Sequence, residues 1–213
     1  MSYEVVFDIE TQNSFAEVDN DFKKLKVSVV SLYRSDLDAY QSFTENELAK
    51  FWPILEKADR IIGYNSEHFD LPVLNNYYLG ELLNFPHLDL MKEIKASVGI
   101  RLKLADVAAA TLDNVTKSAD GLQAIRWWKE GKIDEIKKYC EQDVKFTKDL
   151  YDFGRQHKQL FYKRLTGEVV PFAVNFAELN GAGQKTVPKN IITPYLFKYV
   201  IFAPRNRLRP AVS

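Results

Sequence analysis

The chain has 213 residues, of which 46% are hydrophobic and 27% are charged. This composition is typical of a globular protein that buries its own core, and it excludes intrinsic disorder, collagen-like repeats and a coiled coil as descriptions of the whole chain. Lys plus Arg and Asp plus Glu both number 29, so the formal charge is zero and a uniformly basic surface is excluded. A polyanionic partner therefore has to bind a local patch.

The sequence also bears on the cellular compartment. Its single cysteine, Cys140, cannot form an intramolecular disulfide bond. The N-terminal residues lack the basic region and apolar core of a signal peptide, and the longest apolar runs are far shorter than a membrane span. We therefore expect a cytoplasmic protein with no membrane partner.

Strand and helix patterns alternate in the first half of the chain, which is typical of a layered α/β domain. Residues 3–9 form a nearly continuous apolar run, as expected for a central strand covered on both faces. Residues 26–33 and 39–43, separated by a polar turn, extend this strand into a predicted antiparallel meander. Two later strands are predicted at 60–64 and 87–90.

The predicted helices have recognisable starts. Thr44 and Glu47 have capping-box spacing before an amphipathic stretch that ends near residue 57. Asp70, with a proline two residues later, predicts a helix to about residue 78 with the aspartate as its cap. Further helices are predicted at 104–112, 121–129 and 133–155, followed by a hairpin at 161–176.

Asp8 and Glu10 form the first of three acidic clusters, at the end of the first predicted strand. Side chains alternate along a strand, so both carboxylates point to the same side. Like charges this close raise each other's pKa unless divalent cations compensate them. The pair is consistent with a metal site, although a strand entering a solvated loop is the simpler interpretation of these two residues alone.

The second cluster occupies residues 63–74. Asp70 is equally well explained as a helix cap and as a functional carboxylate when it is considered alone. Asn65 and His68 lie in the same segment, and a lone loop histidine is more often neither a metal ligand nor a base.

Tyr139 and Asp143 form the third cluster, in the long helix predicted at 133–155. They are four residues apart and share a helix face, which borders the apolar stripe through Cys140 and Val144. An inward carboxylate needs a partner such as a metal ion. A buried polar network is the alternative explanation.

Taken in order, these clusters resemble the three exonuclease motifs of the DEDD superfamily of 3′-to-5′ exonucleases. The matching residues are 7–11, then Asn65 with Phe69 and Asp70, then Tyr139 with Asp143. The position five residues before the last aspartate holds Lys138 instead of the histidine of the DEDDh branch, while Tyr139 fits the DEDDy branch, which includes proofreading domains of DNA polymerases. The resemblance implies a ribonuclease H-like fold for residues 1–160, in which a mixed sheet, an antiparallel meander plus parallel strands, is flanked by helices.

The resemblance also implies a metal-dependent mechanism. In-line phosphodiester hydrolysis is served by two divalent cations about 3.5 to 4 Å apart. Hard oxygen ligands select Mg²⁺ or Mn²⁺, and the sequence offers no cysteine or histidine cluster for zinc. Two such ions are implied, and the implied ligands are Asp8, Glu10, Asp70 and Asp143.

The remaining implied roles concern water and substrate. Tyr139 is implied to orient or help deprotonate the attacking water, and a free pKa near 10 favours orientation as its larger contribution. Thr11 and Asn65 are implied to contact the terminal nucleotide. The implied partner is the 3′ end of DNA or RNA.

Two alternatives remain open at this stage. One is a nucleic-acid-binding or partner-docking module of the same fold with negligible turnover, which serves a helicase or polymerase. The other is a haloacid-dehalogenase-like phosphatase with its nucleophile in residues 7–11, but that family usually has a second aspartate where Glu10 stands.

Residues 161–213 are predicted to form a C-terminal hairpin and a basic tail, and the tail from residue 180 is a separate compositional block. The segment 161–176 resembles the hairpin that follows the nuclease core in exonuclease-like proteins associated with helicases. From residue 180 onward there are six basic residues and no acidic ones. They are interpreted as a phosphate-binding track, a solvated end or a protein interface. The tryptophans Trp127 and Trp128 are interpreted as half core and half surface.

Overall fold

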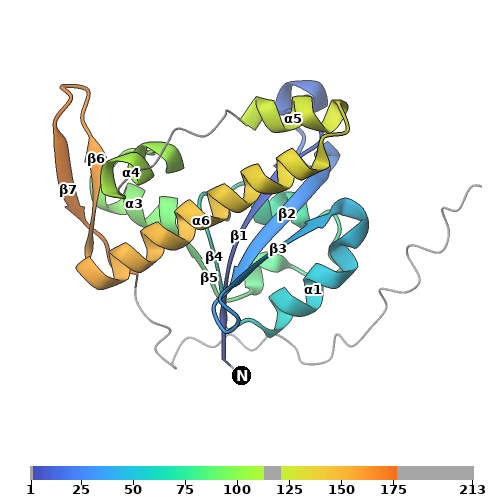
Figure 1. Ribbon diagram of the computed structural model, residues 1–213, viewed down its shortest axis with the longest axis horizontal. Coiled ribbons are helices and arrows are strands. Elements are labelled where there is room, and N and C mark those ends of the chain that lie inside the picture. Colours follow the sequence, from blue (N-terminus) through green and yellow to red (C-terminus); the bar gives the residue numbers. More distant parts are fainter. Residues whose placement is uncertain (1, 113–120, 177–213) are drawn as a thin grey trace, which may run out of the picture.

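The computed structural model describes residues 2–112 and 121–176. Its centre is a five-stranded mixed sheet with the strand order β3-β2-β1-β4-β5 (Figure 1). The strands are β1 (Glu4–Thr11), β2 (Val27–Arg34), β3 (Ala39–Thr44), β4 (Arg60–Gly63) and β5 (His87–Asp89). Neighbours among β1, β2 and β3 are antiparallel, whereas β4 is parallel to β1 and β5 is parallel to β4. The predicted α/β class, with an antiparallel meander plus parallel strands, is confirmed.

Helices flank both faces of this sheet (Figure 1). They are α1 (Leu48–Lys57), α2 (Asp70–Leu74), α3 (Leu90–Val98), α4 (Leu104–Thr111), α5 (Gly121–Lys129) and α6 (Ile133–His157). Four short 3-10 helices also occur in the described residues: η1 (Phe15–Val18), η2 (Phe22–Lys24), η3 (Glu45–Glu47) and η4 (Leu82–Asn84). The predicted capping box is present, because the Thr44 N–H donates to Glu47 Oε2 at 3.2 Å ahead of η3 and α1.

Helix α2 differs from the sequence prediction at both ends. It ends at Leu74 rather than near residue 78, because two asparagines of low helix propensity follow. Its N-cap is Phe69, and Asp70 is the first helical residue rather than the cap. The Asp70 carboxylate instead accepts a hydrogen bond from the Ile9 N–H of β1 at 3.2 Å. The predicted capping role of Asp70 was therefore wrong, and its side chain serves a contact between two elements.

Helix α3 was not predicted. The sequence indicated a strand at residues 87–90 and no further element before residue 104. Asp89 ends β5 and caps α3, since its Oδ1 accepts hydrogen bonds from the N–H groups of Met91 at 2.9 Å and Lys92 at 3.3 Å. Gly99 ends the helix in the left-handed conformation with φ of 80°. An aspartate cap and a terminal glycine are thus the sequence signals of this helix.

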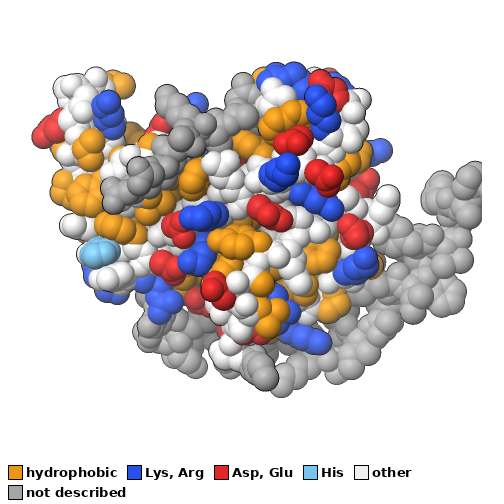
Figure 2. All heavy atoms as spheres, viewed as in Figure 1, with side chains coloured by type: hydrophobic (Ala, Val, Ile, Leu, Met, Phe, Trp, Pro, Cys, Tyr) orange, Lys and Arg blue, Asp and Glu red, His pale blue; other side chains and the backbone are white. Residues whose placement is uncertain are grey.

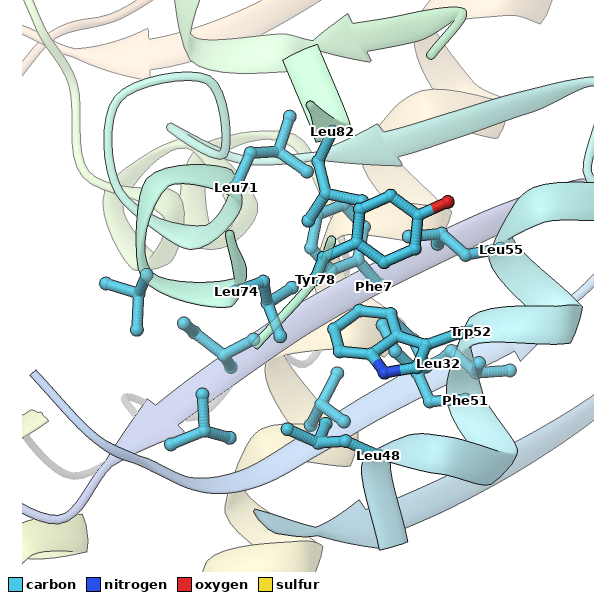
Figure 3. Close-up of a cluster of buried hydrophobic side chains, with 14 of the residues drawn as sticks. Phe7, Leu32, Leu48, Phe51, Trp52, Leu55, Leu71, Leu74, Tyr78 and Leu82 are labelled. Carbon is cyan, nitrogen blue, oxygen red and sulfur yellow. The ribbon is translucent and has the colours of Figure 1, made fainter. Parts of the chain in front are cut away.

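The alternation of side chains along β1 sets the direction of the acidic residues. Odd-numbered residues such as Phe7 pack into the core formed with α1, α2 and η4 (Figure 3). Val6 points to the opposite face, where it packs with residues of α6 and α4. Asp8 and Glu10 continue the series of Val6. They therefore face α6, which lies across this side of the sheet (Figure 1).

The last described element is a hairpin of β6 (Gln159–Lys163) and β7 (Val169–Ala173). It begins two residues before the predicted hairpin, and it packs against α4 and α6. The Thr111 hydroxyl accepts from the Phe161 N–H at 3.0 Å and donates to its carbonyl at 3.2 Å. Leu160 and Phe172 lie in the same apolar core as α3, α4 and α6. The basic residues predicted to form a tail, from 185 to 209, lie outside the described residues.

The surface over α6 carries charges of both signs. Ion pairs join Lys145 to Asp149 at 2.5 Å and Lys148 to Asp152 at 2.8 Å. Figure 2 shows basic and acidic side chains interspersed on this face. In the part of the chain that the structure describes, no helix combines the length and the apolar character needed to cross a membrane.

Candidate metal and nucleic-acid site

A cavity of about 540 Å³ lies at the C-terminal end of β1. Residues from β1, η1, the loop after β4, α2, α5 and α6 line it, and we call it the acidic cavity. All seven site residues expected from the sequence line this cavity: Asp8, Glu10, Thr11, Asn65, Asp70, Tyr139 and Asp143. The structure therefore brings together side chains from four separate segments of the chain.

The carboxylates of Asp8, Glu10 and Asp143 form a compact group in which one oxygen of each lies within 4.8 Å of the others. This contact follows from the fold, because β1 directs Asp8 and Glu10 toward α6 and α6 presents Asp143 to β1. Asp70 approaches the same strand from α2 through its hydrogen bond to Ile9. It lies outside the compact group of three but lines the same cavity.

Burial and mutual repulsion raise the pKa values of these acids. Burial raises the pKa of Asp8 well above its usual range, and the charges of Asp70, Asp143 and Glu10 raise it further. Burial, then Asp143 and Asp70, raise the pKa of Glu10 well above its usual range in the same way.

The pKa values of Asp70 and Asp143 are raised by smaller amounts. Burial raises the pKa of Asp70 to about 7, although its own N–H and that of Ile9 oppose the shift. Burial raises the pKa of Asp143 to about 6, while a hydrogen bond from Tyr139 acts in the opposite direction. Near neutral pH, the four acids therefore resist joint ionisation unless positive charge is brought among them.

The donor set fits a hard divalent cation. Ionised carboxylate oxygens are the ligands that Mg²⁺ and Mn²⁺ prefer, and three of them are already close enough to share one ion. A cation between them supplies the missing positive charge and lowers the pKa of each ligand. Asp8, Glu10 and Asp143 are therefore the residues that suit a metal ion, with Asp70 as a further carboxylate beside them.

Tyr139 is buried and lies one helical turn before Asp143, to which it hydrogen-bonds. Its ring makes an edge contact with Trp127 of α5, with the centroids 6.1 Å apart. Trp127 and Trp128 are partly buried against Ala124 and other residues of the α5–α6 contact. The expectation that these tryptophans are half core is confirmed.

Cys140 makes a contact with the acidic group that the sequence did not indicate. Its thiol lies 3.3 Å from the carbonyl oxygen of Asp8 and 3.6 Å from Asp8 Oδ2, and donates toward both. The Ser31 hydroxyl hydrogen-bonds the thiol, and Ser31 in turn lies 2.8 Å from the Ser42 hydroxyl. Ser42 donates to Glu141 at 2.6 Å. This chain of polar contacts fixes the position of Asp8 through Cys140 and Ser31.

Thr11 and Asn65 also line the acidic cavity. A β-bulge between Glu10 and Thr11 ends the regular pairing of β1 with β2, and the Thr11 hydroxyl donates to the Asn13 carbonyl at 2.9 Å. Asn65 adopts the left-handed conformation with φ of 64°, and its N–H donates to Asp89 Oδ1 at 2.8 Å.

A second cavity, of about 330 Å³, adjoins the first and shares Asn65 with it. We call it the outer cavity, and it is lined by Asn65, Glu67, His68, Asp89, Met91, Lys92, Lys95 and Arg101. His68 is exposed and lies against Phe22, outside the acidic group. Three of the lining residues, Asp89, Lys95 and Arg101, were not expected from the sequence. Of these, only Asp89, a carboxylate at a strand end, follows a pattern that the sequence displays.

Comparison with known proteins agrees with this architecture. A model of the RNase_H superfamily matches residues 5–153. The family B DNA polymerase from the hyperthermophilic archaeon Pyrobaculum calidifontis is 19% identical, with a TM-score of 0.54 over 72% of this chain and 24% of the polymerase. E. coli exonuclease I in complex with a dT13 oligonucleotide is 14% identical, with a TM-score of 0.42 over 74% of this chain and 41% of the exonuclease.

The chain thus spans less than half of each of these two structures. At such low identity, the likeness to the polymerase shows the fold alone. Among curated protein sequences, none matches this chain significantly.

The raised pKa values predict that the metal-free protein loses stability as the pH rises. A carboxyl group whose folded pKa exceeds its unfolded value binds more protons in the folded state, so the free energy of unfolding falls from about pH 4 up through the folded pKa. With pKa values of about 6 for Asp143 and about 7 for Asp70, we expect a loss of roughly 2 to 5 kcal/mol between pH 5 and pH 8 in a chelator. Urea denaturation at both pH values measures it.

The matched variants for this experiment lie on one helix. Asp143→Asn removes the charge at nearly constant shape, so it should reduce the loss and raise stability at pH 8. Asp134→Asn changes an exposed aspartate of α6 and should leave the pH dependence unchanged. A metal-free protein that is equally stable at pH 5 and pH 8 would contradict the electrostatic description of the site.

Proposed function

This chain belongs to the ribonuclease H superfamily, and on that premise we propose that it is a metal-dependent 3′-to-5′ exonuclease of the DEDDy type that acts on DNA or RNA. The single observation that carries the proposal is the convergence of Asp8, Glu10 and Asp143 in one cavity, with Asp70 and Tyr139 on its wall. Membership in this superfamily also excludes the alternative of a haloacid-dehalogenase-like phosphatase.

We assign the metal-binding role to the four carboxylates. Asp8, Glu10 and Asp143 would hold one Mg²⁺ or Mn²⁺, and Asp70, with Asp8, would hold the second. When bound, such ions activate the attacking water and stabilise the leaving 3′ oxygen. The support is the spacing of the three oxygens within 4.8 Å and the high pKa values that need a counter-charge.

The chain's own groups orient the water and the strand. Tyr139 holds its hydroxyl against Asp143, where it positions a water for in-line attack. A phenol hydroxyl suits a hydrogen-bond donor better than a base at neutral pH. Thr11 and Asn65, which line the same cavity, contact the terminal nucleotide. Apolar side chains from η1, the loop before α2 and α5 complete the cavity wall: Phe15, Phe69, Leu122 and Ile125. These provide apolar surface for an unpaired base.

The wider context belongs to the same proposal. We place the nuclease unit in residues 1–160 and treat 161–213 as an appendage of hairpin and basic tail. The substrate is the 3′ end of a nucleic acid, with a helicase or polymerase as the protein partner and the cytoplasm as the compartment. The support is the exonuclease motif pattern of the sequence together with the ribonuclease H-like fold.

A labelled-strand assay tests the proposed function. In the presence of Mn²⁺, single-stranded DNA or RNA labelled at its 5′ end should shorten stepwise from the 3′ end, as seen on a denaturing gel. Asp8→Asn or Asp143→Asn should abolish shortening, because each removes a ligand charge at nearly constant shape. Asp134→Asn, an exposed control on α6, should keep full activity.

Three results would contradict this assignment. The first is internal cleavage in place of stepwise shortening, and the second is activity that survives both ligand substitutions. The third is a wild-type protein that binds strands without cutting them, which would instead favour the docking-module alternative.

Tyr139→Phe tests the proposed positioning of water. Loss of the hydroxyl should lower the cleavage rate by roughly tenfold to a thousandfold, the range for a residue that positions or assists proton transfer, while Mn²⁺ affinity is retained. Single-turnover kinetics and a Mn²⁺ titration measure the two effects. Tyr40→Phe, on the exposed side of β3, is the matched control. A variant that cleaves at the wild-type rate would remove Tyr139 from the mechanism.

A further inference from the structure

The outer cavity is joined to the acidic cavity through one residue. Asn65 lines both, and its side-chain Oδ1 accepts a hydrogen bond from Nη2 of Arg101, which lies between α3 and α4. A ligand that extends out of the acidic cavity past Asn65 therefore meets the guanidinium group of Arg101.

The charges of the outer cavity are only partly neutralised. Its lining has three cations, Lys92, Lys95 and Arg101, and two carboxylates, Glu67 and Asp89. Glu67 forms an ion pair with Lys92 at 2.7 Å. Within residues 2–112 and 121–176, neither Lys95 nor Arg101 forms an ion pair.

Asp89 is committed to the backbone around it. Its oxygens accept hydrogen bonds from the N–H groups of Asn65 at 2.8 Å, Glu67 at 3.1 Å and Met91 at 2.9 Å. The buried Asp89 thus fixes the loop that carries Asn65 and the start of the helix that carries Lys95. Asp89 consequently fixes the backbone frame of the outer cavity, and Lys95 and Arg101 in its lining are exposed.

The donors of Arg101 are suited to a phosphate. A guanidinium group has five N–H donors in a planar fork, and Asn65 uses one of them. The remaining donors match the oxygens of a phosphodiester, and Lys95 adds a second positive charge in the same cavity. The face over α6 differs, because Lys145 and Lys148 there are paired with aspartates.

We propose that the outer cavity binds a backbone phosphate of the substrate strand, next to the linkage that is cut, through Arg101 and Lys95. This inference rests on the proposed function, since it takes the acidic cavity as the place of cleavage. Repulsion between the acids and the strand is then offset by cations in the adjoining cavity. Asn65 couples the two cavities, because it lines both while it holds Arg101.

Binding without turnover tests this proposal. In an Asp8→Asn background with chelator, fluorescence anisotropy of a labelled single-stranded 12-mer gives the dissociation constant over a range of salt concentrations. Arg101→Gln and Lys95→Gln should each weaken binding by roughly fivefold to tenfold at low salt, and each should reduce the salt slope by about 0.7, the value for one lost contact to a single strand. Lys57→Gln, an exposed lysine of α1, is the matched control and should bind like the parent.

A neutral linkage identifies which phosphate is bound. A single methylphosphonate is moved through the first four linkages from the 3′ end, and each oligonucleotide is measured with the parent and with Arg101→Gln. At one position near the 3′ end, the neutral linkage should weaken binding to the parent but not to Arg101→Gln, as a double-mutant cycle requires for a direct contact. Arg101→Lys should keep part of the effect.

The outcomes separate this inference from the proposed function. If the parent does not bind strands, if both cation variants bind like it, or if no linkage couples to Arg101, the inference is wrong. In the second and third cases, stepwise shortening by the wild-type protein leaves the exonuclease proposal intact. Conversely, Arg101-dependent coupling in a protein that never shortens strands would support the phosphate site and refute the exonuclease.

Discussion

Repulsion among buried carboxylates is the constraint on which the site depends. Asp8, Glu10 and Asp143 lie within 4.8 Å of one another in a largely buried setting, where burial and like charge both favour the protonated forms. A protein gains no stability from such an arrangement in the absence of cations. The fold must therefore hold the three acids in place by other interactions, and this requirement explains much of the structure around them.

Those interactions come from both faces of β1. Its odd-numbered residues anchor the strand in the core with α1 and α2 (Figure 3), while Val6 packs toward α6. Cys140 of α6 holds Asp8 by two contacts and is itself held through Ser31. Apolar packing on both sides of the strand thus offsets the electrostatic cost at its end. The same contacts fix the three acids close to one another.

The sequence predicted those parts of the site that depend on local geometry. Side-chain alternation is enough to place Asp8 and Glu10 on one side of a strand, and four-residue spacing is enough to place Tyr139 beside Asp143. The central sheet followed from the same kind of pattern.

The parts that the sequence did not predict depend on distant contacts. Arg101 meets Asn65 across 36 residues, and Cys140 meets Asp8 across 132 residues. No periodicity encodes such pairs. Asp70 illustrates an intermediate case: its place near a helix start suggested a cap, but its carboxylate accepts a hydrogen bond from the N–H of Ile9 on another element.

The central claim is that these acids hold protons near neutral pH and exchange them for a divalent cation. Calorimetric titration with Mn²⁺ at pH 6.5, repeated in buffers of different ionisation enthalpy, counts the protons that each binding event releases. The account predicts saturable binding with the release of about one proton or more per protein molecule. Absence of binding, or binding without proton release, would contradict it.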